Sequence, residues 1–405
     1  MQFDEVVQYG HALWRLARAQ GAAPEAPVTL LGKPGIGKSA ATRGVAAEIA
    51  SELGREVHDL VRPLPQGGKV EDLVLFYAAD LSSFLPEDLS GLPMPREEEL
   101  EGRKVLVTRY ASNSWLEPFC RPGAVGVLCL DDLPAAAPAV AIAARQLVLD
   151  RRVGQHRLSD GVLLFVTGNR REDGAGASKL PSHFCNVVQL MELDSSFGSA
   201  FPGWHKWYRG QGLAPEVPAF LLYKNALFSK APRDADRLGA YPTPRSWAKL
   251  GAVLPAAQEV GLVSTAAAAL VGEGAGSEFA AYVKVRSELV SPKEVLKDFR
   301  RALPNPGETL SSPDRRHAMA SGLAETAVAL SKDKRLSPTA RAKLAVSFVR
   351  AVGWVTEGNR EYVATSVSTW IASGGSMAAL TLALRDGKDD PLVAACAQYI
   401  AKALR

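Results

Sequence analysis

The first 200 residues alternate short apolar runs with longer stretches of helical pattern. The runs beginning at 125 and 162 are continuously apolar, which is typical of strands covered on both faces. Because helical stretches separate the runs, the pattern predicts a mostly parallel sheet with flanking helices. The predicted strands are residues 28–31, 73–78, 125–130, 162–167 and 187–193.

Helical pattern dominates after about residue 203, where the strand signals fade. Four helix starts share a capping residue followed by proline, which suits the first helical position; they are Ser291-Pro292, Ser312-Pro313, Ser337-Pro338 and Asp390-Pro391. We therefore expect three parts: an α/β sheet domain at 1–202, an all-helical domain at 203–290, and a C-terminal helical segment at 291–405. The stretch 304–307, Pro-Asn-Pro-Gly, is the best candidate for an internal linker.

Composition excludes several classes of protein. The 405 residues contain 47 Lys and Arg against 43 Asp and Glu, a net charge of +4, which disfavours a dedicated nucleic-acid coat or a polybasic membrane binder. No apolar run reaches the roughly 18 residues of a membrane span, and the N-terminus lacks the apolar core of a secretory signal. Four cysteines without CxxC spacing favour a reducing cytoplasm over a disulfide framework or a zinc site.

One glycine-rich stretch carries specific chemistry. Residues 32–39 fit the pattern G-x-x-x-x-G-K-[ST], between an apolar strand and a helix. Glycines let backbone N–H groups converge on phosphate oxygens, the lysine reaches the terminal phosphates, and the hydroxyl ligates Mg²⁺. We expect a nucleotide site formed by Gly32, Lys33, Pro34, Gly35, Ile36, Gly37, Lys38 and Ser39.

Acidic residues follow the apolar run at 125–130. An apolar strand that ends in acid is how P-loop enzymes hold Mg²⁺, a role that falls here to Asp131 together with Ser39. Asp132 stands where a catalytic base would polarise the attacking water. The alternative is a strand followed by a solvated Asp-Asp turn.

Two further residues are candidates for sensing the phosphates. Asn169 follows the strand at 162–167, where it could orient the water or contact the γ-phosphate; alone, Gly-Asn-Arg is more often a turn. Arg245, in the stretch Pro-Thr-Pro-Arg-Ser-Trp, opens a helix of the second part. It could reach the phosphates across a domain junction, or be a surface arginine beside a capping loop.

These motifs together resemble AAA+ ATPases, and within them the MoxR-like branch. The resemblance covers roughly residues 25–300, and both order and spacing match; its pieces are GKPGIGKS, PEDLSGLP, GVLCLDDLPAAAPAV, RQLVLDRRVGQHRLSDG, VTGNRREDGAG, LPSHFCN, PTPRSW and VGEGAGSEF. It implies a P-loop AAA+ sheet domain with a helical lid, Asn169 as sensor 1 and Arg245 as sensor 2.

The resemblance also implies how such a protein works. It implies a hairpin at 151–161 and an insert at about 80–117, both facing the working surface of a ring. It further implies binding of ATP rather than GTP, assembly into a hexamer, and chaperone-like remodelling of a client or a von Willebrand factor A-type partner.

The chain departs from the family pattern at two positions. The family usually has Asp-Glu where this chain has Asp131-Asp132, and aspartate is one methylene shorter. The arginine expected near the end of the LPSHFCN segment is replaced by Val187. Arg170 and Arg171 are possible substitutes for this finger. Both departures predict hydrolysis that is slow or completed by a partner subunit.

Three functions therefore stay open from the sequence. The first is the ring-forming, Mg²⁺-dependent ATPase that remodels a protein partner. The second is a nucleotide switch with negligible turnover. The third is a nucleic-acid-acting NTPase, which only a basic stretch at 151–157 supports and which the small net charge disfavours.

Overall fold

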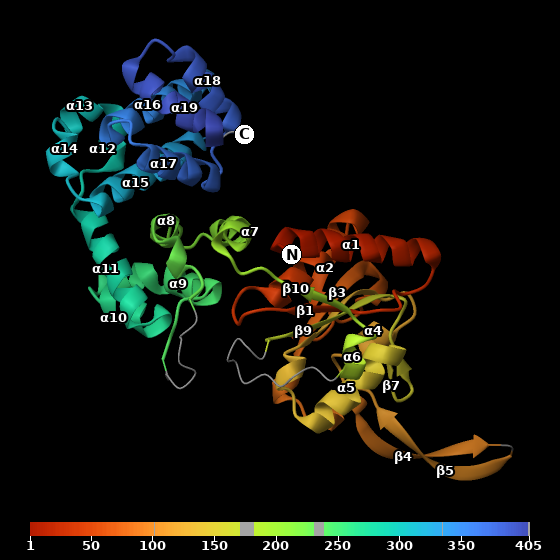
Figure 1. Cartoon of the computed structure of the whole chain (residues 1–405). Helices are drawn as coiled ribbons and strands as arrows, with labels where there is room; N and C mark the ends of the chain where they lie inside the picture. Colours follow the sequence, from red (N-terminus) through yellow and green to blue (C-terminus); the bar gives the residue numbers. More distant parts are fainter. Residues whose placement is uncertain (101, 171–181, 231–238, 334, 404–405) are drawn as a thin grey trace. The chain divides into compact units, whose positions relative to one another are not determined.

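A computed structural model of the chain is shown in Figure 1. The chain folds into two compact units, Met1–Ala200 and Phe201–Arg405. The description covers residues 1–100, 102–170, 182–230, 239–333 and 335–403. Within these ranges, no helix combines the length and the apolar character that crossing a bilayer would require.

A six-stranded parallel sheet forms the centre of the first unit. Its order is β10-β1-β9-β6-β3-β2, and each neighbouring pair runs parallel. The predicted parallel α/β architecture is therefore confirmed. The strands are β1 (Val28–Leu31), β2 (Glu56–Asp59), β3 (Leu73–Asp80), β6 (Val125–Asp131), β9 (Gly161–Gly168) and β10 (Gln189–Glu192).

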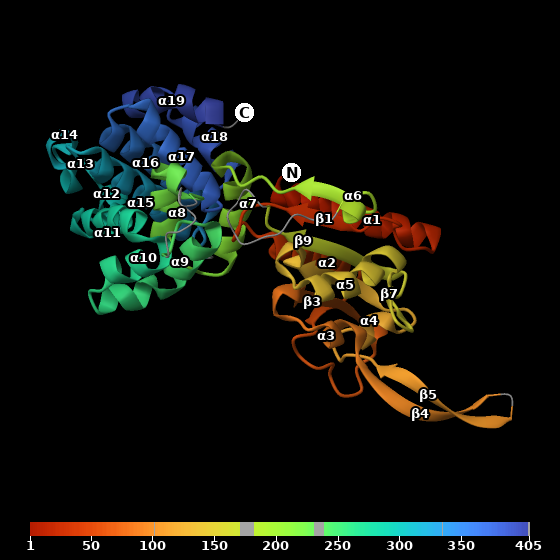
Figure 2. The same ribbon diagram turned by 60° about the horizontal axis from the view of Figure 1, so that its bottom comes forward.

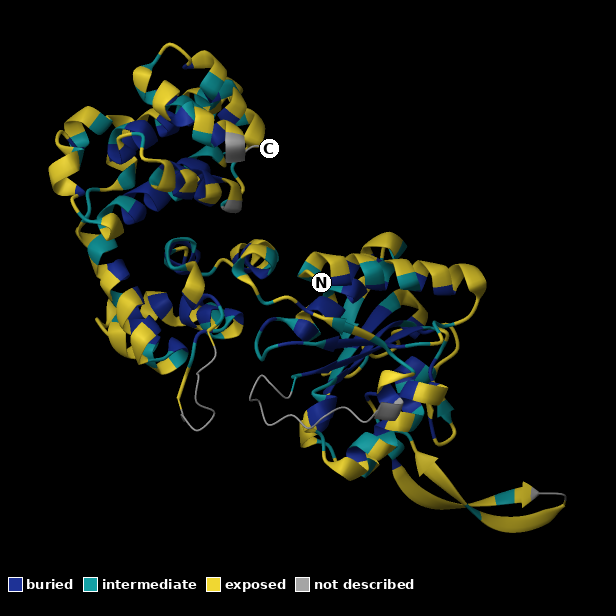
Figure 3. Ribbon diagram, in the orientation of Figure 1, coloured by how far each residue is buried: buried dark blue, intermediate teal, exposed yellow. Residues whose placement is uncertain are grey.

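Both faces of the sheet are covered, which explains the continuously apolar strands. Along β6, Val127 and Cys129 belong to one hydrophobic core, whereas Leu128 and Leu130 belong to the other. The first core includes residues of α1 (Phe3–Gln20) and α2 (Lys38–Leu53), and the second includes residues of α5 (Pro138–Asp150). Figure 3 shows this buried interior between exposed helix faces.

Helix α2 follows the phosphate loop, as the sequence predicted, and Gly54 ends it. Gly54 adopts the left-handed conformation at φ 65°, and its N–H reaches back to the carbonyls of Ala50 and Ser51. A left-handed residue at this position is the usual way to terminate a helix, and glycine adopts it without steric cost.

An insertion between β3 and β6 carries a hairpin that projects away from the sheet (Figure 2). It contains α3 (Pro86–Ser90), a long hairpin of β4 (Leu92–Leu100) and β5 (Arg103–Ala111), and α4 (Glu117–Cys120). The predicted hairpin at 151–161 is also present, as β7 (Arg152–Val153) and β8 (His156–Arg157). The two hairpins meet, because the side chains of Gln155 and His156 hydrogen-bond the carbonyl oxygen of Tyr110.

The described part of the second unit is helical, as the pattern predicted. Its helices are α7 (Phe197–Gly210, which begins in the first unit), α8 (Glu216–Tyr223), α9 (Pro244–Glu259), α10 (Val263–Val271), α11 (Glu273–Glu288), α12 (Pro292–Lys297), α13 (Phe299–Ala302), α14 (Pro306–Thr309), α15 (Pro313–Ser331), α16 (Pro338–Thr356), α17 (Arg360–Ala372), α18 (Met377–Asp386) and α19 (Pro391–Ala403). All four predicted proline starts begin a helix.

The linker expected at 304–307 is wrong. Its first two residues lie between the short helices α13 and α14, and its last two begin α14. Leu303 and Leu310, which flank it, are buried in that core. Pro306 takes the first position of α14, which suits proline, so this stretch lies within one packed body and does not connect two bodies.

Close packing of α1 on α2 generates a stability prediction. A Cβ on Gly10 would lie 2.6 Å from Val45 Cγ2 and 3.0 Å from Phe165 Cζ, all in the buried core. Gly10→Ala should therefore lower the free energy of unfolding by about 1 kcal/mol or more, because the cost of overpacking the core exceeds the stability gained from the higher helix propensity of alanine. Urea unfolding measures it. Gly198→Ala is the control, because no atom lies within 4 Å of its added Cβ; equal stability of the two variants would contradict the packing.

Candidate nucleotide site

The candidate site lies where three neighbouring strands end. β9 pairs with β1 on one side and with β6 on the other, so the carboxyl ends of these parallel strands meet at one edge of the sheet. In open α/β sheets this edge is where ligands bind. The phosphate loop follows β1, Asp131 ends β6 and Asp132 follows it, and Asn169 follows β9.

The phosphate loop depends on two glycines with positive φ. Gly35 has φ 73° and Gly37 has φ 97°, in the left-handed region that side chains disfavour. Gly37 is also the N-cap of α2, so the first backbone N–H groups of that helix face the loop. Ile36 between them is buried in the hydrophobic core and anchors the loop. The loop thus presents a helix N-terminus to an anion.

Lys38 lies inside this loop and is only 7% exposed. Its ammonium donates to the carbonyl oxygens of Gly32 at 2.9 Å and Lys33 at 3.0 Å. It also donates to Oδ1 of Asn169 at 2.7 Å. A buried charge needs such partners. The result is a cation held at the rim of the loop and joined to the end of β9.

Asp131 receives hydrogen bonds from three directions. The hydroxyl of Ser39 donates to Oδ2 at 2.6 Å, the hydroxyl of Thr167 donates to Oδ1, and the backbone N–H of Asp132 donates to Oδ1 at 3.2 Å. The predicted metal ligands, Ser39 and Asp131, are therefore in contact. A hydroxyl beside a carboxylate is the oxygen-rich donor set that Mg²⁺ prefers.

Thr167 was not predicted as a site residue. It is a fully buried polar residue near the end of the otherwise apolar β9. That single polar position was the available signal. Its partner became clear only from the pairing of β9 with β6, in which Leu130 lies beside Val166. The next positions along the two strands are Asp131 and Thr167.

The two predicted catalytic residues of this unit are also brought together. The side-chain amide of Asn169 donates to Oδ1 of Asp132 at 3.1 Å, while its Oδ1 accepts from Lys38. Asn169 therefore connects the phosphate loop to the end of β6. Asp132 itself has φ 53°, a left-handed conformation that aspartate tolerates better than most residues.

Cys129 packs beneath the acidic strand end and contributes no ionisable group to the site. The residue is fully buried on β6. Burial and, to a smaller extent, the negative charge of Asp131 raise the pKa of its thiol. The thiol is therefore protonated at neutral pH and behaves as a small apolar side chain.

The outcome differs among the three predicted arginines. Arg245 belongs to the second unit, where it is exposed in the first turn of α9, so its sensor role stays a prediction. Arg170 forms an ion pair with Glu192 at the end of β10, at 3.3 Å. Arg171 lies outside the described residues. The identity of a finger arginine also stays a prediction.

Comparison with solved structures finds distant similarity. A point mutant of RuvB from Thermotoga maritima matches with 14% identity and a TM-score of 0.36, covering 77% of this chain and 82% of that one. NtrX from Brucella abortus matches at 12% identity and TM-score 0.31, covering 77% and 64%. PCH-2 from C. elegans matches at 14% and 0.29, covering 70% and 69%. No protein-family model and no curated protein matches the chain. The interpretation of the site therefore rests on its own geometry.

The hydroxyl of Thr167 generates a prediction about metal binding. Thr167→Val removes one donor that orients Asp131, so Mg²⁺ should strengthen nucleotide binding about tenfold less than in the native protein. Nucleotide affinity in the presence of a chelator should stay unchanged. Equilibrium titration with a fluorescent ATP analogue, with and without Mg²⁺, measures both.

Thr29→Val is the matched control for Thr167→Val. Thr29 is equally buried on the adjacent strand β1, and its hydroxyl has no partner among the described residues. Its loss should leave the Mg²⁺ effect intact. An equal effect of the two substitutions would show that Thr167 acts through general packing.

Proposed function

We propose that this chain is a Mg²⁺-dependent ATPase of the AAA+ type, similar to the MoxR-like branch, that assembles into a ring and remodels a protein partner. The observation that carries the proposal is the junction of Lys38, Ser39, Asp131 and Asn169 at one edge of a parallel sheet. These are the residue types that P-loop NTPases use, placed on neighbouring strand ends.

Binding of the triphosphate follows from the loop and its lysine. Backbone N–H groups at the start of α2 and the positive end of that helix favour phosphate oxygens. The Lys38 ammonium, now bonded to loop carbonyls, can exchange these partners for the β- and γ-phosphates. Phosphate is the stronger acceptor, because the hydrogen bond then joins opposite charges.

The same geometry supports Mg²⁺ as the cofactor. Ser39 and Asp131 would hold the ion, and the buried Thr167 hydroxyl would fix the orientation of the carboxylate. When bound, the ion would neutralise negative charge on the phosphates. Asp131 already faces Ser39, so the ligand pair needs little rearrangement to receive the ion.

Hydrolysis requires a base and a group that orients water. Asp132 and Asn169 are the candidates, and their 3.1 Å contact places both beside Lys38. Aspartate at 132 reaches less far than glutamate, and Val187 stands where the family has an arginine. We therefore propose slow hydrolysis that is completed by an arginine of a neighbouring subunit, which favours a ring, by analogy a hexamer, over a monomer.

The partner would be a protein instead of a nucleic acid. The insert hairpin β4–β5 is exposed at nearly every described position, and it touches the second hairpin through Tyr110. By analogy with MoxR-like proteins, these hairpins would engage a client or a von Willebrand factor A-type partner. The four free cysteines are consistent with a protein that acts in the reducing cytoplasm.

Lys38→Ala should abolish turnover. The substitution removes the buried ammonium that contacts the loop carbonyls and Asn169, so steady-state ATP hydrolysis should fall by about 10²-fold or more. Circular dichroism should show the fold retained. Lys33→Ala is the matched control, because Lys33 accepts from Lys38 through its backbone carbonyl, which the substitution keeps. Undiminished turnover by Lys38→Ala would refute the site assignment.

A nucleotide switch is the second candidate, and the short Asp132 side chain favours it. The two proposals differ in how specific activity depends on protein concentration. Activity that rises with concentration is expected for the ATPase, because sites are completed between subunits. Flat, near-zero activity with intact ATP binding is expected for the switch.

A further inference from the structure

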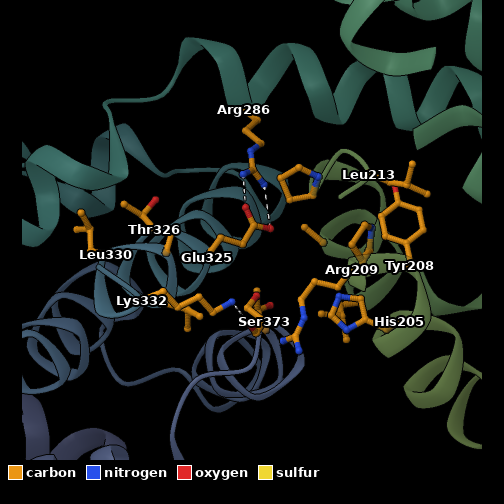
Figure 4. A pocket seen from close by; sticks show the side chains of 17 residues that line it. His205, Tyr208, Arg209, Leu213, Arg286, Glu325, Thr326, Leu330, Lys332 and Ser373 are labelled. Carbon is orange, nitrogen blue, oxygen red and sulfur yellow. Dashed lines mark hydrogen bonds and ion pairs between the residues drawn. The ribbon is translucent and has the colours of Figure 1, made fainter. Parts of the chain in front are cut away.

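A cavity of about 570 Å³ lies within the second unit, among its helices (Figure 4). Residues of α7, α8, α11, α15 and α17 line it, so its walls come from both sides of residue 290, where the sequence separated two helical parts. Its volume falls in the range of about 300–1,000 Å³ that is typical of small-molecule sites, which also occur between the helices of bundles. The described lining shares no residue with the candidate nucleotide site.

The body of this cavity is apolar. Its apolar side chains come from α8, from α15 and from the loop that precedes α8; they are Leu213, Pro215, Pro218, Leu222, Val328 and Leu330. A ligand that covers such walls removes apolar surface from water, both its own and that of the protein, which favours binding in proportion to the area covered. A molecule that is mainly hydrocarbon would therefore gain most of its affinity from these walls.

The ionised groups in the interior of the cavity neutralise each other. Arg286 and Glu325 form an ion pair, drawn with dashed lines in Figure 4, and their side chains are 21% and 13% exposed. His205 is buried, and this burial, followed by the charge of Arg209, lowers its pKa to about 4. The imidazole is therefore neutral at pH 7. Among the described lining residues, the interior thus offers a charged ligand no unbalanced charge.

Two further cations, Arg209 and Lys332, belong to the outer part of the lining. Both residues are exposed, so water solvates their charges. The Lys332 ammonium also donates to the carbonyl oxygen of Ser373 at 3.1 Å. An ion pair formed at such an exposed place contributes little, because water competes for both partners. An anionic ligand would therefore gain little from either cation.

One polar group inside the cavity lacks a partner. Thr369 on α17 lines the cavity and is 3% exposed, and its hydroxyl has no hydrogen-bond partner among the described residues. A buried hydroxyl without a partner is unfavourable, and this group can both donate and accept a hydrogen bond. Threonine in a helix has two favoured χ1 rotamers, so the hydroxyl can turn toward a ligand. An uncharged polar group would satisfy it.

We propose that this cavity binds a small, uncharged and mainly apolar organic molecule that carries one hydrogen-bonding group, such as an alcohol or an amide. Its hydrocarbon body lies along α8 and α15, and its polar group meets the hydroxyl of Thr369. Because the lining comes from both sides of residue 290, the bound molecule stabilises the packing of the two helical parts against each other. A ligand that binds only the folded chain raises its stability.

The experiment uses the full chain and phenylnaphthylamine, an uncharged aromatic amine whose fluorescence rises in apolar surroundings. We expect one saturable site, from which octanol displaces the dye. Anilinonaphthalenesulfonate, the sulfonated analogue, should bind no more tightly, because the interior of the cavity holds no unbalanced charge. Tighter binding of the sulfonated dye would overturn the proposal, since the site would then select anions.

Filling the cavity tests where the dye binds. Leu222→Trp enlarges an apolar side chain of the lining and should abolish saturable dye binding. Leu262→Trp is the matched control, because Leu262 is 53% exposed and lies outside the lining, and this variant should bind the dye as the native chain does. Circular dichroism checks the fold of both variants. Equal dye binding by the two folded variants would overturn the proposal.

Loss of one hydroxyl tests the polar contact without enlarging a side chain. Thr369→Val should weaken octanol binding about threefold to tenfold, as expected for one hydrogen bond, and should not weaken the binding of octane. Thr356→Val is its control, because Thr356 is also buried but lies on α16, outside the lining. Unchanged octanol binding by Thr369→Val would contradict the assigned contact and with it the proposal. Dye displacement is measured instead of turnover, so a failed ATPase test leaves these results intact.

Discussion

The carboxylate of Asp131 joins the segments from which the candidate site is built. It ends β6, accepts from Ser39 at the start of α2, and accepts from Thr167 on β9. A carboxylate at a sheet edge is stabilised by several hydrogen-bond donors. The hydrogen bond from Ser39 also holds the start of α2 at the end of β6. Without this carboxylate, Ser39 and Thr167 would lose their shared acceptor, and the start of α2 would lose its hydrogen bond to the end of β6.

The sheet makes this arrangement possible because its strands run parallel. Parallel pairing places the ends of β1, β9 and β6 at one edge, and two hydrophobic cores on opposite faces keep the strands in place. Burial on both faces leaves the strand ends as the places where polar groups can be presented. The chemistry is therefore concentrated at the edge that the phosphate loop also reaches.

Much of this site could be predicted from the sequence, because its signals are local. The phosphate loop is a contiguous motif, and the aspartates directly follow an apolar run. Thr167 could not be assigned a partner, since that required the register between β6 and β9. Strand β2 was missed because its four residues, Glu-Val-His-Asp, form a mostly polar edge strand. The cavity of the second unit is lined by residues of five helices that lie up to about 170 positions apart in the sequence, so no local sequence pattern predicts it.

The central claim is that one Mg²⁺-bound nucleotide occupies the junction of Lys38, Ser39 and Asp131. Isothermal titration calorimetry of the purified chain with ATP tests it most directly, with Mg²⁺ present and then removed by a chelator. The account predicts one site per chain, with tighter binding when Mg²⁺ is present. Absence of ATP binding under both conditions, or an affinity that Mg²⁺ does not change, would contradict it.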